Sequence, residues 1–85
     1  MSARIDRITA AVESFNDDLT SLLDALNSAI EREVENRSIY HEWRAEAIEE
    51  NNDKDVEFWD ARIDDTWNRE WAFRESLKLV REHLC

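Results

Sequence analysis

The 85-residue sequence contains no glycine and no proline. Strand-rich folds rely on these residues for tight turns, whereas both residues weaken the interior of a helix. Their absence therefore favours long, uninterrupted helices. It also excludes the glycine-rich loops that bind phosphate groups in nucleotide-binding proteins.

Cysteine and long apolar runs are also scarce. The single cysteine, Cys85, cannot form a disulfide within the chain. A lone thiol is typical of an intracellular protein, and no neighbouring residue is placed to activate this one. The first residues, MSARIDRITAAV, do not resemble a secretory signal peptide, and no run of apolar residues is long enough to span a membrane. We therefore expect a cytoplasmic protein, located in the host cytoplasm if a virus encodes it.

Basic residues are few, since 21 acidic residues oppose 11 basic ones and the net charge is −10. Residues 31–60 hold eleven acids and four bases, whereas residues 61–85 hold five of each. Repulsion between carboxylates and phosphates disfavours direct binding to nucleic acids or to anionic membranes. The charge instead favours a partner protein with a basic surface.

What the sequence does contain is two apolar seams whose steps alternate between three and four residues, the pattern of packed helices. The first seam consists of Ile5, Ile8, Val12, Phe15, Leu19, Leu22, Leu26 and Ala29, followed by Ile30 and Val34. It continues more weakly through Arg37 or Ser38, His41, Ala45 and Ile48. The second seam consists of Val56, Trp59, Ile63, Thr66, Glu70, Phe73, Leu77, Val80 and Leu84.

Residues 51–55, NNDKD, form the one plausible turn between the two seams. Asn51 or Asn52 can adopt the left-handed backbone conformation that ends a helix where glycine is lacking. Asp53 or Asp55 can then cap the next helix. The sequence thus predicts an all-α fold, a long antiparallel hairpin with coiled-coil-like packing. A single domain, residues 1–85, would contain one helix over residues 3–50, a turn over 51–54 and a second helix over 55–84.

The two predicted helices differ in length, which leaves the start of the first helix without a partner in its own chain. The residues concerned are Ile5, Ile8, Val12, Phe15 and Leu19. Apolar surface left in water is unfavourable, so we expect these residues to form a homodimer that completes a helical bundle. Alternatively, the chain bends at residues 14–18 and folds back as a third helix.

Two polar residues, Thr66 and Glu70, interrupt the second seam. Arg37 of the first helix is the natural partner of Glu70, and His41 is an alternative. Such a pair is expected to fix the helix register more than it adds stability.

Paired acids on the two arms of the hairpin raise the possibility of a metal site. Glu46 and Glu49, with Glu57 and Asp60, resemble the paired acidic motifs of all-helical nucleotide pyrophosphohydrolases, which implies Mg²⁺ or Mn²⁺ and phosphate chemistry. However, Trp59 and Ile48 are expected to occupy the inward face there and to leave the acids in solvent. The sequence also lacks a Glu-x-x-His motif for a di-iron site and a histidine–acid pair beside any serine. We therefore expect no metal, no cofactor, no catalytic residue and no enzymatic activity.

The acids and two off-seam tryptophans suggest a partner-binding surface instead. Its predicted residues are Glu42, Glu46, Glu49, Glu50, Asp53, Asp55, Glu57, Asp60, Asp64, Trp67 and Trp71. Carboxylates on a rigid rod can imitate phosphates, and exposed tryptophan is common in binding hot spots.

In composition the chain resembles small acidic inhibitors encoded by viruses, such as some anti-CRISPR and anti-restriction proteins. The resemblance implies an inhibitor that occludes a basic or nucleic-acid-binding surface of a larger protein. The alternatives are a structural or adaptor coiled-coil dimer or small chaperone, and a metal-dependent nucleotide phosphohydrolase.

Overall fold

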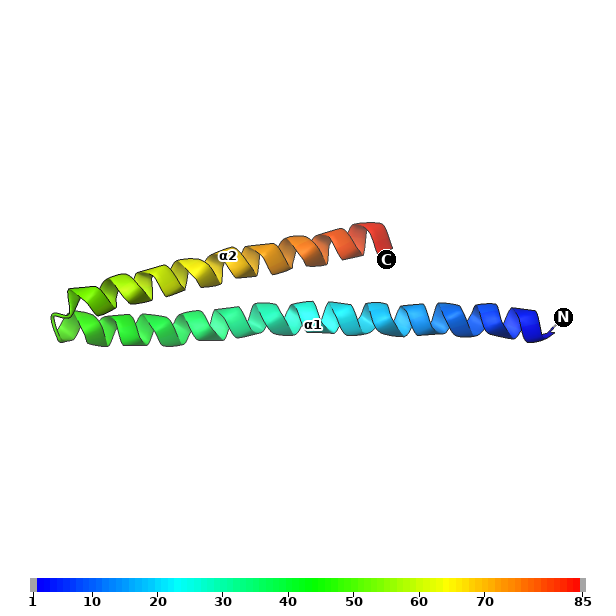
Figure 1. The fold of residues 1–85 in the computed structure, drawn as a ribbon, viewed down its shortest axis with the longest axis horizontal. Helices are drawn as coiled ribbons and strands as arrows, with labels where there is room; N and C mark the ends of the chain where they lie inside the picture. Colours follow the sequence, from blue (N-terminus) through cyan, green and yellow to red (C-terminus); the bar gives the residue numbers. More distant parts are fainter. Residues whose placement is uncertain (1, 85) are drawn as a thin grey trace.

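The computed structural model describes residues 2–84, which form two α-helices, α1 (Ser2–Glu49) and α2 (Asp53–Leu84). The helices run antiparallel and form an extended hairpin that measures 75 × 17 × 13 Å (Figure 1). The predicted all-α hairpin is therefore confirmed. Helix α1 continues without interruption through residues 14–18, so the chain does not fold back there as a third helix. Cys85 lies outside the described residues.

The end of α1 is closed by a Schellman motif built around Asn51. The N–H of Asn51 donates to the carbonyl of Ile48 (3.1 Å), and the N–H of Asn52 donates to the carbonyl of Ala47 (2.9 Å). Asn51 has a φ of 56°, in the left-handed region that normally favours glycine. The predicted helix-ending role of an asparagine is confirmed, because its short polar side chain tolerates this conformation better than most residues do.

The cap of α2 is Asn52, and the prediction of Asp53 or Asp55 was wrong. The Asn52 side-chain oxygen accepts a hydrogen bond from the backbone N–H of Asp55 (3.2 Å), and its amide donates to the Asp55 carboxylate (2.7 Å). The carbonyl of Asn52 also accepts the first helical hydrogen bond, from Val56 (3.1 Å). The two aspartates lie in the first turn of α2, where the helix dipole favours negative charge. Helix α2 consequently begins at Asp53 rather than at about residue 55.

The face of α1 that packs against α2 alternates steps of four and three along its whole paired length. It consists of Leu19, Leu23, Leu26, Ile30, Glu33, Arg37, Tyr40, Arg44 and Ala47, all buried or half-buried. The predicted seam was wrong at Leu22, which is 43% exposed whereas Leu23 is half-buried. Its continuation beyond Ile30 was wrong except at Arg37: Val34 and Ile48 are 44% and 50% exposed, and His41 and Ala45 are also exposed. The alternation of four-residue and three-residue steps continues along α1 even where it falls on polar residues. Glu33 and Arg37 therefore face α2 in place of the neighbouring apolar residues.

The inward face of α2 follows the predicted seam. Ile63, Thr66, Glu70 and Leu77 are buried, whereas Leu84 is exposed. Figure 1 shows that α2 separates from α1 towards its C-terminal end, which explains why the tight packing lies nearer the turn.

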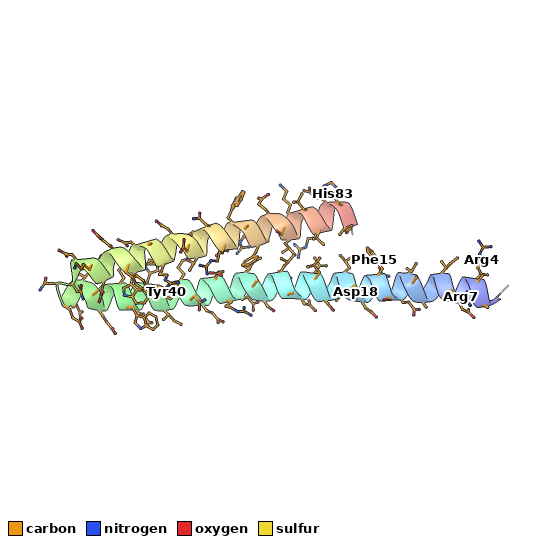
Figure 2. The ribbon with its side chains drawn as sticks, in the orientation of Figure 1. Arg4, Arg7, Phe15, Asp18, Tyr40 and His83 are labelled. Carbon is orange, nitrogen blue, oxygen red and sulfur yellow. The ribbon has the colours of Figure 1, made fainter. Side chains whose placement is uncertain are left out.

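The start of α1 extends well beyond the end of α2 (Figure 1). We call residues 3–18 the N-terminal arm, because all of them are exposed and Leu19 is half-buried. The apolar side chains of the arm, Ile5, Ile8, Val12 and Phe15, are between 51% and 59% exposed. Figure 2 shows Phe15 on the side of α1 that faces α2. The arm is therefore an apolar face that no residue of α2 covers within residues 2–84.

Because Asn51 has a left-handed backbone conformation, replacing it with glycine should stabilise the fold, whereas the same replacement inside a helix should destabilise it. Asn51→Gly should raise the free energy of unfolding by up to about 1 kcal/mol, because glycine removes the steric penalty of its side chain. Asn68→Gly, at an exposed position inside α2, should lower it by a few tenths of a kcal/mol. Urea unfolding followed by circular dichroism at one fixed protein concentration measures both. Destabilisation by Asn51→Gly would contradict the assignment of the motif.

Candidate protein-binding surface at the closed end of the hairpin

The closed end of the hairpin carries most of the excess negative charge. Residues 42–60, here called the acidic tip, contain eight acids and two bases. One base is already occupied, since Arg44 Nε lies 2.5 Å from Asp60 Oδ1. The remaining acids of the tip form no ion pair within residues 2–84, and all are exposed: Glu42, Glu46, Glu49, Glu50, Asp53, Asp55 and Glu57. Asp64, also exposed, lies one turn further along α2.

A surface groove lies within the acidic tip, between the two helices. Its lining residues are Trp43, Glu46, Ala47, Glu50, Asp55 and Trp59. Trp43, Glu46 and Ala47 share one face of α1 because they are spaced three and four apart, and Glu50 follows directly after the helix. The α2 residues are one turn apart. Ala47 is buried and contributes only a small side chain to the lining.

An aromatic cluster supports this groove. The Trp59 ring is half-buried and lies 5.5 Å from Tyr40, 4.9 Å from Trp43 and 4.8 Å from Phe58, measured between ring centroids. These separations fall in the range of favourable aromatic pairs. The cluster fixes Trp43 and Trp59 beside the carboxylates before any partner arrives.

The chemistry of the groove suits a cationic side chain. An aromatic face attracts a cation through its quadrupole, and nearby carboxylates accept charged hydrogen bonds from it. Glu46, Glu50 and Asp55 supply the carboxylates, and Trp43 and Trp59 supply the rings. The groove could therefore receive a lysine or arginine side chain of another protein.

The predicted partner-binding residues do not all lie together. The nine acids occupy the closed end or its next turn, whereas Trp67 and Trp71 lie further along α2 and are 53% and 66% exposed. The tryptophans that share the groove with the acids are Trp43 and Trp59, which the sequence analysis did not assign to this surface. Their spacing from Glu46 and Asp55, three and four residues, was the available signal.

A polar layer in the middle of the hairpin consists of Arg37, Thr66 and Glu70. Arg37 Nη2 donates to Glu70 Oε1 (2.8 Å), and Arg37 Nε donates to Thr66 Oγ1 (3.0 Å). The predicted Arg37–Glu70 pair is thus confirmed, and the exposed His41 is not the partner. The Arg37 guanidinium also stacks on Trp67, with its central carbon 3.4 Å from the ring centroid. The guanidinium therefore covers one face of the Trp67 ring, which is otherwise exposed.

Hydrogen bonds to two arginines lower the pKa of Glu70 below its ordinary value. The larger effect comes from Arg37, and the second from Arg74, whose Nε donates to Glu70 Oε2 (2.9 Å). The two guanidiniums outweigh desolvation of the carboxylate, which acts in the opposite direction. Glu70 therefore remains ionised in the folded protein at pH values where a free glutamate is protonated.

Glu33 is a buried acid that the sequence analysis did not identify. Its Oε1 lies 3.7 Å from Arg69 Nη1, but its Oε2 is buried and has no hydrogen-bond partner within residues 2–84. An unsatisfied buried oxygen is unfavourable. The residue lies inward because the heptad places it there, and its neighbour Val34 is turned outward instead.

The four acids considered for a metal site do not form one. Glu46, Glu49, Glu57 and Asp60 are exposed, and Asp60 is paired with Arg44. Across residues 2–84, no group of three or more His, Cys, Asp or Glu side chains is placed to hold a metal ion.

Comparison with protein-family models, with curated proteins and with solved structures gives no match. Neither helix, over the part of the chain that the structure describes, combines the length and the apolar character needed to cross a membrane.

The lowered pKa of Glu70 predicts a specific pH dependence of stability. Its contribution should be fully present above the unfolded pKa of about 4.5 and should be lost as the pH falls through the lower folded pKa. Glu70→Gln should lower the free energy of unfolding by about 1–3 kcal/mol at neutral pH. It should also flatten the decline in stability below pH 4.5. Urea unfolding measured from neutral to acidic pH tests both effects. Asp64→Asn, which removes an exposed acid, is the matched control and should leave the decline unchanged.

Proposed function

We propose that this protein is a non-enzymatic binding module whose acidic tip docks onto a basic, nucleic-acid-binding surface of a larger protein and blocks it. The observation that carries the proposal is the groove in which Trp43 and Trp59 lie beside Glu46, Glu50 and Asp55. Charge alone would explain solubility. Charge arranged around two packed and partly accessible indole rings provides both attraction and a specific contact.

The geometry of the acidic tip suits a protein that blocks the nucleic-acid-binding surface of its partner. The acids lie on two packed helices and the hydrogen-bonded turn that joins them, so their backbone positions are fixed relative to one another. Binding would therefore require little ordering of the backbone, although the exposed side chains would still lose rotamer freedom. Its carboxylates would occupy lysine and arginine positions that otherwise contact phosphates, which is the logic of a nucleic-acid mimic. In this respect the protein would act like anti-CRISPR or anti-restriction inhibitors, with no nucleic acid bound directly.

A second candidate function is that of a structural or adaptor coiled-coil protein. The observation that favours it is the exposed apolar face of the N-terminal arm, which lies at the opposite end of the rod from the acidic tip. Under that function the tip charge serves solubility only. The two candidates therefore predict different consequences of removing charge from the tip.

Two variants that each lose three charges distinguish these functions. The tip variant is Glu46→Gln/Glu50→Gln/Asp55→Asn, and the control variant is Glu13→Gln/Asp17→Asn/Asp24→Asn on α1. An arginine-rich peptide serves as the probe, and binding is followed by tryptophan fluorescence over a range of salt concentrations. The tip variant should bind at least about tenfold more weakly than the control, since several charged contacts are lost at one site. Affinity of the unmodified protein should fall as salt rises.

The same pair of variants can be immobilised to test capture of basic nucleic-acid-binding proteins and release by competing DNA. Equal binding by the two variants would show that only net charge matters, and the blocking function would then be wrong. Circular dichroism of both variants checks that the helices are retained.

A further inference from the structure

The apolar face of the N-terminal arm continues the contact face of the hairpin. At 100° per residue, Ile5, Ile8, Val12 and Phe15 point within about 40° of the direction of Leu19. Leu19 begins the face of α1 that packs against α2. Figure 2 shows Phe15 on that same side. The arm therefore prolongs an existing helix–helix interface past the point where α2 ends.

Apolar surface is also exposed where α2 ends. Leu22 of α1 and Leu84 of α2 are both exposed, and α2 separates from α1 in this region (Figure 1). A helix laid along the arm would therefore meet apolar side chains of both helices at its far end. The occupant that suits this surface is a helix with the same three–four apolar spacing.

Charge on α1 selects the direction of such a helix. The first two turns of α1 carry Arg4 and Arg7, labelled in Figure 2, against one acid, Asp6. The following stretch, residues 13–24, carries four acids and no base. A parallel pair of arms would place like charges together and would also bring two acidic tips side by side. An antiparallel pair places the arginines of each copy near the acids of the other, which is favourable.

We infer that two copies of this chain associate through their N-terminal arms in an antiparallel orientation, with the acidic tips at opposite ends. The register follows from the seam. When Val12 lies opposite Phe15 of the second copy, Ile8 meets Leu19 and Ile5 meets Leu22, and each contact occurs twice. All the arm's apolar positions then have apolar partners. The first turns of the second copy also come to lie beside the separated end of α2.

This arrangement fixes the length of the assembly. Its centre lies between residues 13 and 14, and each hairpin end lies about 55 Å from that centre at 1.5 Å per residue. The dimer should therefore be about 110 Å long, whereas one molecule measures 75 Å. A parallel dimer would keep the length of one molecule. The inference involves the end of the rod opposite the acidic tip, so it can fail or hold independently of the proposed function.

The test combines light scattering and small-angle X-ray scattering on the full chain over a concentration series. We expect twice the monomer mass and a maximum dimension of about 110 Å. Val12→Glu should raise the dissociation constant at least about 100-fold, because two charges would be buried without partners. Ala10→Glu, which places the same charge on the opposite side of α1, should leave the dissociation constant within about threefold. Circular dichroism at equal concentrations checks that both variants retain the helix content of the unmodified protein.

Each other outcome overturns the inference. A monomer at all concentrations removes the second copy, and a larger assembly contradicts the pairing. A dimer of about 75 Å contradicts the antiparallel orientation. Equal weakening by Val12→Glu and Ala10→Glu contradicts the assigned face.

Discussion

The register of this hairpin depends on Arg37, which hydrogen-bonds to Thr66 and Glu70 of α2 and stacks on Trp67. Within residues 2–84 few apolar side chains are buried: Ile30, Ala47, Ile63 and Leu77. Apolar packing is not directional, and such a short series of contacts tolerates a slide of one helix along the other. The Arg37 guanidinium does not tolerate such a slide, because its two hydrogen bonds are accepted by Thr66 and Glu70, which lie one turn apart on α2. A shift of α2 by one residue would rotate both acceptors away from the fork.

The Schellman turn and the polar layer together determine where the candidate site forms. The turn fixes the start of α2 relative to the end of α1, and the polar layer fixes the register further along. Between these two constraints lie Trp43 and Trp59, whose rings pack at 4.9 Å. The groove at the acidic tip is thus a consequence of a defined register. A slide by one turn would separate the carboxylates of α1 from Asp55.

The sequence was sufficient for the parts of the structure that depend on short-range rules. Absence of glycine and proline, together with the three–four spacing, predicted both helices, and the asparagine pair predicted the turn. Apart from Arg37, the inward face of α1 beyond Ile30 was missed, because hydrophobicity favoured Val34 and Ile48 whereas the helix phase turned Glu33 and Tyr40 inward. In a hairpin of two helices each helix has one contact face. Apolar residues off that face stay exposed, and polarity is then a poor guide to burial.

The groove was missed for a related reason. Its six residues come from two helices and the turn between them, and their proximity depends on the register that Arg37 and the turn impose. From sequence alone, the acids could be placed at one end of the rod but not around particular rings. Trp67 illustrates the same limit, since its exposure was foreseen but its stacking under Arg37 was not.

The distribution of charge along the rod supports the proposal that the acidic tip binds a partner. Charge that only maintains solubility is effective wherever it is exposed. Here residues 61–85 carry equal numbers of acids and bases, while the tip carries eight acids against two bases. Four arginines, Arg37, Arg44, Arg69 and Arg74, each pair with an acid outside the groove. The carboxylates beside Trp43 and Trp59 form no ion pair within residues 2–84, and under the proposed function a cation supplied by a partner protein would complete the site.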